Sequence, residues 1–486
     1  MAMNTNTQSV STISAGTQNI LIGYLAVCGA VLALLMVFGL LLRLGQGGVV
    51  ALPADLSYQI LTAHGIGMVG ISGFGGAAIM WYFLSRQVSL TPLILLLNLV
   101  LFLLGVVLIL GAVFLGGFAG AWTFLYPLPA QSGGAWEAHT AAIYMVGVLL
   151  VGVGFLLLHL DTGWAILKRY GSLSKALGWP QMFGTSNEEA PPPVVVASTM
   201  VLVINTLGLV SGAAILVLTI VNIYVPSFAL DALLAKNMIF FFGHVFINAT
   251  IYMAVIAVYE ILPTYTGRPW KTSRPFLMAW NASMIMVLAV YPHHFLMDFV
   301  MPTWALILGQ IVSYTSGLPV LVVTGLGVLI NVSRSGIRWD MTSGLLFLAT
   351  LGWALGVIPA IVDGTIVVNM VMHNTLWVPG HFHTYLLIGQ TTMVFGFMYF
   401  VGARPDSSGD TAIDRLAFWV FAVASLGFTM TFLYAGANGV PRRFAEHLEQ
   451  WIGPDQLGAL FGALVIVAVL IFVVRFFQRL GRLKTA

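Results

Sequence analysis

Seven of the ten histidines stand in or beside long apolar runs of the chain, where an ionisable side chain is costly and often functional. They occur in four motifs: LTAHG (His64), FFGHV (His244), YPHHF (His293, His294) and HNTLWVPGHFH (His373, His381, His383). The other three, His139, His159 and His447, stand near helix ends or in a polar loop, and we predict structural roles for them.

The spacing of these histidines indicates more than one metal. His381 and His383 are two residues apart, so on a helix they point roughly 200° away from each other and bind two different metals more easily than one. A single axial histidine suits a haem with an open site, and a histidine pair suits a closed electron-transfer haem. His244, His293 and His294 form a set without thiolate or carboxylate, which suits copper or zinc. Because zinc has no redox chemistry, copper fits better beside a haem.

The elements that carry these histidines are predicted to be membrane-spanning helices. The chain is 59% hydrophobic and only 7% charged, with a mean hydropathy of +0.98, whereas a soluble domain has roughly 25% charged residues. Twelve apolar runs are long enough to cross a bilayer. We therefore predict an all-α polytopic membrane protein with twelve transmembrane helices at 19–43, 58–84, 90–115, 138–162, 194–224, 237–262, 275–293, 303–331, 342–362, 376–402, 414–436 and 457–478.

The predicted topology brings the motif histidines to one depth in the bilayer. The second, sixth and tenth spans run from outside to inside and carry His64, His244, His381 and His383 roughly four to seven residues from their outer ends. The seventh span runs outward and ends in the HH pair near the same layer. Histidines with unrelated structural roles would not be expected to share one depth.

The distribution of basic residues predicts the orientation. With both termini in the cytoplasm, 15 of the 19 Lys and Arg residues lie inside, and the outer ones are Arg43, Lys236, Arg442 and Arg443. We expect a disordered tail at 1–18, one domain at 19–478 and a cytoplasmic tail at 479–486. No basic run indicates a nucleic-acid partner. The single cysteine, Cys28, excludes a disulfide within the chain and a cysteine-based copper or iron–sulfur centre.

At these motifs the sequence resembles subunit I of the haem–copper oxidase superfamily, and its B-type branch most closely. Six ligand-type histidines occur in the family's order, and the strongest stretch is VMHNTLWVPGHFH at 371–383. Supporting pieces are LTAHG at 61–65, GAWTFLYPL at 120–128, FFGH at 241–244, ILP at 261–263, HH at 293–294 and NGVPRRF at 438–444. A proton-relay transporter would also carry buried histidines, but it would not need a His-Phe-His pair beside a separate three-histidine cluster.

The resemblance implies a set of cofactors and site residues. His64 and His383 resemble the axial ligands of a low-spin haem, and His381 resembles the ligand of a high-spin haem. The copper ion would be held by His244, His293 and His294, and the haem propionates would lie near His373, Arg442 and Arg443. Because Arg442 and Arg443 are two of only four basic residues outside, they suit charge-assisted contacts to those carboxylates.

One position departs from the oxidase pattern. Oxidases of this superfamily usually carry a tyrosine four residues after the histidine that corresponds to His244, whereas this chain has Asn248. An asparagine supplies neither the electron nor the proton that the phenol gives for splitting dioxygen. Joining two nitric oxide molecules needs only two electrons, and known nitric oxide reductases of the superfamily lack the tyrosine. We therefore favour reduction of nitric oxide to nitrous oxide, with Asn248 among the candidate catalytic residues, and keep a proton-translocating cytochrome c oxidase as the alternative.

The resemblance also implies partners and a proton path. Electrons would enter from a small cupredoxin-like subunit II, fed by cytochrome c or a similar carrier, in a bacterial or archaeal cytoplasmic membrane. Tyr259, Ser313 and Thr315 are candidates for a path of protons to the site. Val255 and Val320 stand where the B-type pattern has hydroxyl side chains, which argues against proton pumping.

Overall fold

The computed structural model describes residues 14–403 and 409–484, and within these ranges every regular element is a helix. Twelve helical segments are long and apolar enough to cross a membrane, as the sequence predicts. They are α1 (Ala15–Gln46), α2 (Ala54–Leu84), α3 (Pro92–Phe114), α4 (Ala138–Tyr170), α7 (Pro193–Tyr224), α8 (Ala232–Thr266), α9 (Arg274–Ala289) with η1 (Tyr291–Phe295), α10 (Thr303–Thr315) with α11 (Leu318–Val332), α12 (Met341–Asp363), α14 (Trp377–His383) with η2 (Thr384–Thr391) and α15 (Thr392–Val401), α16 (Ala412–Ala437) and α17 (Ile452–Lys484).

The ends of the chain differ from the predicted tails. α1 begins inside the predicted tail, because the Ser14 side chain accepts a hydrogen bond from the Thr17 amide and so caps the helix. At the other end α17 continues past 478 to Lys484. Residues 1–13 and 485–486 lie outside the described part of the chain. The first and last helices therefore extend beyond the predicted spans 19–43 and 457–478.

Three spans are interrupted near the motif histidines. The seventh span passes from α9 into the 3₁₀-helix η1, which carries the HH pair. The eighth span is divided between α10 and α11 at Ser316 and Gly317, two residues before Pro319, which has no N–H to donate to the helix. The tenth span contains the π-helical segment η2 directly after His383. Such irregular turns often occur at functional sites.

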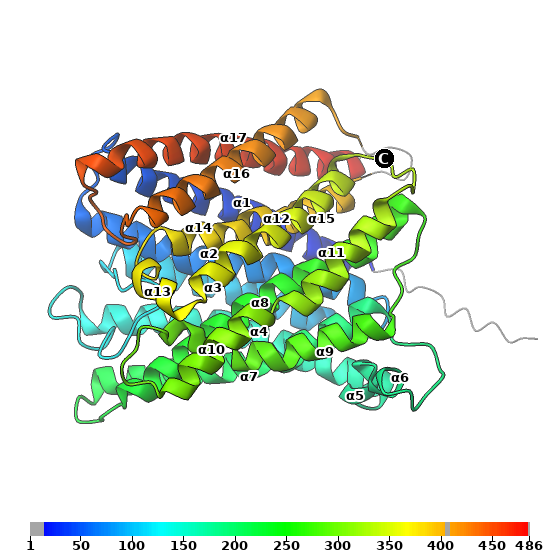
Figure 1. Ribbon diagram of the computed structural model, residues 1–486, viewed down its shortest axis with the longest axis horizontal. Coiled ribbons are helices and arrows are strands. Elements are labelled where there is room, and N and C mark those ends of the chain that lie inside the picture. Colours follow the sequence, from blue (N-terminus) through cyan, green and yellow to red (C-terminus); the bar gives the residue numbers. More distant parts are fainter. Residues whose placement is uncertain (1–13, 404–408, 485–486) are drawn as a thin grey trace, which may run out of the picture.

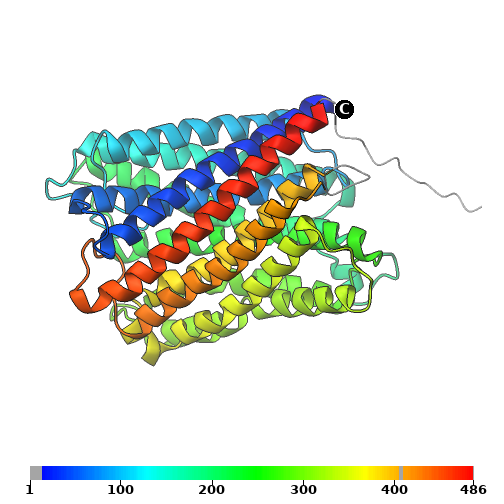
Figure 2. The same cartoon turned by 90° about the horizontal axis from the view of Figure 1, so that it is seen from above.

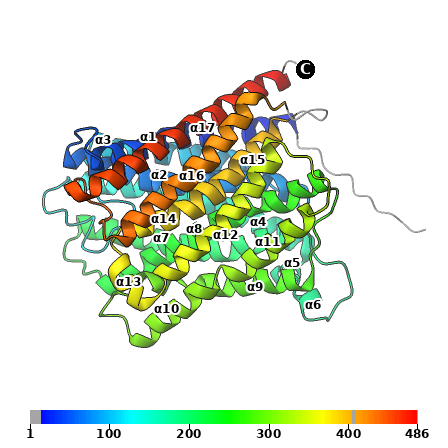
Figure 3. The same cartoon turned by 45° about the horizontal axis from the view of Figure 1, so that its top comes forward.

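The helices form a bundle whose axes run roughly along one direction (Figure 1). Seen from above, α1 and α17 lie side by side, and α1 begins on the side on which α17 ends (Figure 2). This arrangement agrees with an even number of crossings. The short helices α5 (Leu173–Ala176) and α6 (Trp179–Met182) lie beyond the ends of the spans on that same side, and α13 (Ile366–Met372) lies at the opposite end (Figure 3).

Three of the four spans that carry the motif histidines form the interior of the bundle, and the fourth, Arg274–Phe295, is 56% buried. Of the most apolar stretch in each span, 72% is buried in α2 and 83% in both α8 and α14–α15, against 17% in α10–α11. The outer helices expose large apolar side chains, including Leu104, Val107 and Ile330, which suits a lipid environment. The histidine motifs therefore lie where the protein itself, not lipid, surrounds them.

Candidate metal centre

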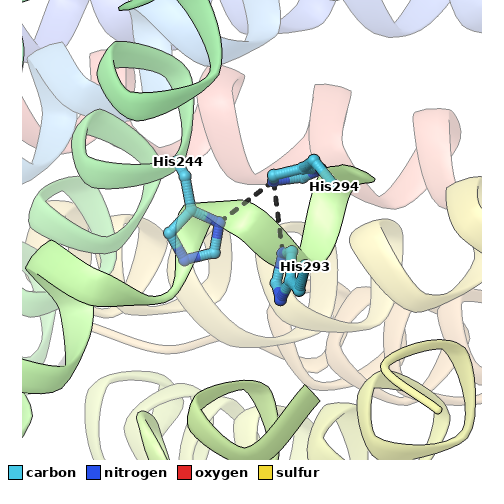
Figure 4. Close-up of side chains that lie close together, drawn as sticks. All are labelled: His244, His293 and His294. Carbon is cyan, nitrogen blue, oxygen red and sulfur yellow. Dashed lines mark hydrogen bonds between the residues drawn. The ribbon is translucent and has the colours of Figure 1, made fainter. Parts of the chain in front are cut away.

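One histidine of α8 and two of η1 lie close together (Figure 4). The Nδ1 atom of His244 lies 3.1 Å from Nε2 of His294, which lies 3.2 Å from Nε2 of His293. Three imidazole nitrogens that bind one ion at about 2.0 Å each lie roughly 3.3 Å apart. One nitrogen of each ring is therefore already close to the position that a shared metal ion requires, and all three ligand atoms lie within 4.8 Å of one another.

The local fold explains how two consecutive histidines reach one ion. Pro292 stands at the start of η1, and the tighter 3₁₀ turn there delivers His293 and His294 to the same cavity. α10 packs closely behind them, because a Cβ atom on Gly309 would lie only 2.9 Å from the His293 backbone nitrogen. The Ser313 hydroxyl lies 3.0 Å from Nδ1 of His293, the nitrogen that faces away from the cluster. Such outer contacts orient metal-binding histidines.

His64 and His383 form a second, separate pair. Their rings are nearly parallel, with an interplanar angle of 17° and 6.4 Å between the ring centres. Their Nδ1 atoms lie 2.7 Å from the carbonyl oxygens of Leu35 and Pro379, respectively. This contact makes Nδ1 the donor and leaves each Nε2 lone pair for a metal. Two metal–imidazole bonds of about 2.0 Å, plus the distance from each nitrogen to its ring centre, span roughly 6 Å. The gap fits one iron atom held between the two rings.

His381 faces a different part of the interior from His383. His383 packs against Phe432 of α16, with 5.2 Å between ring centres and an angle of 10°, whereas His381 packs edge-on against Tyr385. His381 is also close enough to His244 and His293 to interact with them electrostatically. The two-residue spacing thus places one imidazole beside His64 and the other beside the three-histidine cluster.

One cavity of about 620 Å³ connects all six of these histidines. Besides them, its walls include Trp122 of the 114–138 connection, Trp353 of α12 and the outer residues His373, Arg442 and Arg443. A cavity of this size suits large, mostly apolar cofactors with a few polar groups that fix their orientation. The residues present therefore fit two haems and one additional metal ion.

One rim of the cavity, formed by His373, Arg442 and Arg443, is positively charged. The loop after α16 is fastened to the segment before α14 by two backbone hydrogen bonds, from Leu376 to Val440 and from Arg442 to Asn374, each 2.9 Å long. Burial and the neighbouring Arg443 lower the pKa of Arg442 to about 10. Burial and both guanidinium groups lower the pKa of His373 to about 4. The rim therefore carries two adjacent guanidinium charges beside a neutral imidazole, which favours carboxylates such as haem propionates.

The structure separates the three residues predicted for a proton path. The hydroxyl of Tyr259 lies 2.5 Å from that of Thr324 on α11, and Ser313 contacts His293 at the cluster. Thr315 instead donates a 3.0 Å hydrogen bond back to its own helix at Ile311 and does not extend this set.

Other hydroxyl groups lie between Tyr259 and the cluster. Tyr252 lines the cavity one turn from Asn248, and its hydroxyl lies near Ser283. Ser283 in turn donates a 3.0 Å hydrogen bond to the Ser316 carbonyl, at the break between α10 and α11. Ser283 and Thr324 could not be recognised from the sequence, because their helices, α9 and α11, show no distinctive motif at these positions.

The three histidines predicted to be structural lie apart from the six. His139 is exposed, and His159 is fully buried with its Nε2 atom 2.7 Å from the Asn205 amide nitrogen. His447 is also buried and contacts Asp455 at 2.5 Å. None of these three lines the cavity described above.

Asp455 also binds Arg43, in a buried ion pair that the sequence analysis did not foresee. The distance from the Arg43 Nη2 atom to the carboxylate is 2.6 Å, and the two side chains are 3% and 0% exposed. The Arg43 guanidinium stands over the Phe432 ring, 4.6 Å from its centre, and Phe432 stacks on His383. Arg43 was predicted simply as an outer-loop charge. The structure instead makes it part of the packing around the His64–His383 pair.

Replacing Asp455 with alanine should destabilise the protein by roughly 3–5 kcal/mol, because it leaves the buried Arg43 charge without a partner. The midpoint of thermal unfolding of the purified protein in detergent measures the effect. Arg338→Ala is the matched control, since Arg338 is 64% exposed in its pair with Asp340 and such surface pairs contribute about 0–1 kcal/mol. Equal shifts for both variants would contradict the expectation.

The fold and the site together define a class of multi-pass helical membrane protein. In this class, a pair of histidines with room for one iron atom between them lies beside a cluster of three histidines that can hold another metal ion. Residues 19–471 match the protein family described as "Cytochrome C and Quinol oxidase polypeptide I". The chain belongs to this family, which agrees with the resemblance to haem–copper oxidase subunit I.

Individual relatives are distant. The chain is 26% identical over 235 residues to a haem–copper oxidase subunit I+III from Aeropyrum pernix. The matched stretch covers 47% of this chain and 28% of that relative. It is 24% identical over 294 residues to cytochrome c oxidase subunit 1 from Cereibacter sphaeroides, covering 58% of this chain and 50% of the relative. It is also 24% identical over 276 residues to cytochrome c oxidase subunit 1 from Thermus thermophilus. This match covers 51% of this chain and 48% of the relative.

The matched part of the chain thus spans half or less of the length of these relatives. Among solved structures, a haem–copper terminal oxidase dimer studied by cryo-EM has a TM-score of 0.75 with 19% identity. That likeness covers 96% of this chain and 84% of the solved chain. It shows that the two chains share a fold.

Proposed function

We propose that this chain is the catalytic subunit of a membrane haem–copper oxidoreductase that reduces nitric oxide to nitrous oxide. The observation that carries this choice is Asn248, which lies one helical turn from His244 and contacts its imidazole. Position 248 is not a phenol, so the site lacks the group there that would add one of the four electrons needed to split dioxygen. Nitric oxide reduction does not need that group, because 2 NO, two electrons and two protons give N₂O and H₂O.

Each of the six histidines has one proposed role. His64 and His383 would hold a low-spin haem, His381 a high-spin haem, and His244, His293 and His294 a copper ion. When bound, the second haem and the copper supply the two electrons and the open coordination positions for the reaction. His373, Arg442 and Arg443 would bind the propionates and so fix the orientation of both haems at the outer rim.

The residues of the chain also exclude water and supply protons. The cavity is enclosed mainly by apolar side chains, among them Ile247, Trp353 and Phe382, which keep the reacting groups in a low dielectric. The Ser313 hydroxyl contacts His293, and Tyr252 lines the same cavity near Ser283. With Tyr259 and Thr324 further inward, they form the proposed route for the two protons.

The proposed setting is a bacterial or archaeal cytoplasmic membrane with both chain termini in the cytoplasm. Electrons would then arrive from outside, through a cupredoxin-like subunit II supplied by cytochrome c or a similar carrier. A haem iron bound by both His64 and His383 would have no free coordination position for a substrate. This pair therefore suits an electron-transfer role.

Reduction of dioxygen to water, with proton translocation, is the second candidate function. Tyr252 favours it, because its side chain lines the same cavity one turn further along α8 than Asn248. Two of the relatives described above are named cytochrome c oxidases. Nitric oxide remains our first choice, since Tyr252 packs edge-on against Trp280 and does not contact His244 as Asn248 does.

Turnover of the purified, reduced enzyme decides between the two reactions. We expect anaerobic consumption of nitric oxide, with nitrous oxide as product, to exceed consumption of dioxygen by at least about tenfold, a difference of about 1.4 kcal/mol in activation free energy. His293→Leu, which removes a proposed copper ligand, is the inactive control. Rapid dioxygen reduction with negligible nitrous oxide would contradict the proposal.

A further inference from the structure

Asn248 contacts the nitrogen of His244 that faces away from the three-histidine cluster. Its amide nitrogen Nδ2 lies 2.9 Å from Nε2 of His244 and 3.0 Å from the His244 carbonyl oxygen. The other ring nitrogen, Nδ1, points to His294 at 3.1 Å. Asn248 therefore contacts the same imidazole as the metal would, but on the opposite edge of the ring.

The hydrogen bonds in the structure define one tautomer of His244. The Asn248 amide has two N–H groups, and one donates to the His244 carbonyl while the other donates to Nε2. A neutral imidazole that accepts at Nε2 carries its proton on Nδ1. That proton lies toward Nε2 of His294. In this state both ring nitrogens of His244 have hydrogen-bond partners, Asn248 and His294, and no metal ion is needed.

A metal ion in the cluster requires the other tautomer. The Nδ1 lone pair of His244 must then face the ion, so the proton resides on Nε2. A carboxamide carries a donor and an acceptor in nearly the same shape, and a half-turn of the Asn248 side chain presents its oxygen to that N–H while giving up its hydrogen bond to the His244 carbonyl. Asparagine can therefore satisfy Nε2 in both states, whereas leucine satisfies neither and aspartate satisfies only the metal-bound one.

We propose that Asn248 is a positioning residue that holds the His244 ring with Nδ1 toward the cluster and fixes the tautomer that binds copper. The inference rests on the proposed copper ion and deepens that assignment. In this reading the residue that replaces the family's phenol does not take part in redox chemistry; it orients a ligand through a hydrogen bond.

Another Asn–His pair in the membrane provides a matched control. Asn205 on α7 contacts His159 on α4 through the same atoms, Nδ2 and Nε2, at 2.7 Å, and both side chains are fully buried. Neither residue lines the cavity that contains the six histidines. Asn205→Leu therefore removes a comparable hydrogen bond at a position where no effect on the cluster is expected.

The test is the copper affinity of the purified protein, measured by competition with a chelator of known affinity, together with the copper content and the haem spectrum. Asn248→Leu should bind copper about 10–100-fold more weakly than the unsubstituted protein, as is typical when a partner of a metal-binding histidine is lost. Asn248→Asp, which accepts from the Nε2 proton of the metal-bound form, should bind copper at least as tightly as the unsubstituted protein. Asn205→Leu should leave the affinity unchanged.

The outcomes separate the inference from the proposed function. Copper affinity in Asn248→Leu equal to that of the unsubstituted protein would overturn the positioning role while leaving the copper site intact. Equal weakening in Asn248→Leu and Asn205→Leu would overturn it as well, because the effect would then be general. If Asn248→Leu does not fold, loss of copper in a folded Asn248→Asp variant overturns it. An unsubstituted protein without copper would refute the proposed cofactor itself.

Discussion

Replacing His383 with leucine should remove one of the two haems from the purified protein and leave the copper in place. The ring centres of His64 and His383 lie 6.4 Å apart, so in the proposed assignment each would supply one of the two protein ligands to the iron of one haem. Leucine offers no ligand atom, and a haem held only by His64 loses both affinity and its low-spin spectrum. The haem content should fall from about two to about one per protein, with a loss of turnover of at least about 100-fold.

Haem content, measured as the pyridine complex, and copper analysis of the same sample check this expectation. His159→Leu is the control, because His159 is a fully buried histidine that contacts Asn205 away from the cavity. It should keep both haems and the copper. A His383→Leu protein with two haems and an unchanged low-spin spectrum would show that His64 and His383 do not share an iron.

The spans and the six histidines could be predicted from the sequence for separate physical reasons. A bilayer requires long, uninterrupted apolar runs, so each span is visible without knowledge of its neighbours. Ionisable side chains are rare in such runs, and therefore His64 and His244 stand out individually. The spacing of His381 and His383 fixes their relative direction on any helix.

Which side chains meet could not be predicted in the same way. The contact between Arg43 and Asp455 joins the first and last spans, and nothing near either residue in the sequence identifies the partner. The same is true of Tyr259 and Thr324, whose hydroxyl groups meet between α8 and α11. Such pairs depend on how helices pack against one another. A single polar residue in a helix gives no periodic signal that would identify its partner.

The hydroxyl of Thr315, predicted for a proton path, bonds its own helix for a local reason. A threonine hydroxyl in a helix readily bonds the carbonyl four residues earlier, and Thr315 does so with Ile311. The break after Thr315 leaves the carbonyl of Ser316 to accept the bond from Ser283 instead. A polar residue at a plausible position was thus not sufficient, because its own backbone competed for the hydrogen bond.

Close packing of α16 against α14 leads to the second large expected effect. A Cβ atom on Gly436 would lie 1.9 Å from the backbone nitrogen of Trp377 and 2.5 Å from its Cα atom, far inside contact distance. The obstacle is backbone, which cannot turn aside as a flexible side chain would. Gly436→Ala must therefore displace the start of α14, four residues before His381. We expect a loss of about 3 kcal/mol or more in stability, together with reduced haem content.

Gly325→Ala on α11 provides the comparison, because nothing lies within 4 Å of a Cβ atom there. In that helix interior alanine should stabilise the protein by up to about 1 kcal/mol, since glycine loses more backbone entropy on folding. Thermal unfolding and haem content of the two variants, measured side by side, test the argument. If Gly436→Ala behaved like Gly325→Ala, α14 would have to be free to move, and its two histidines could not be held at fixed distances from their partners. The rigidity of this one contact is thus a condition for both haem positions.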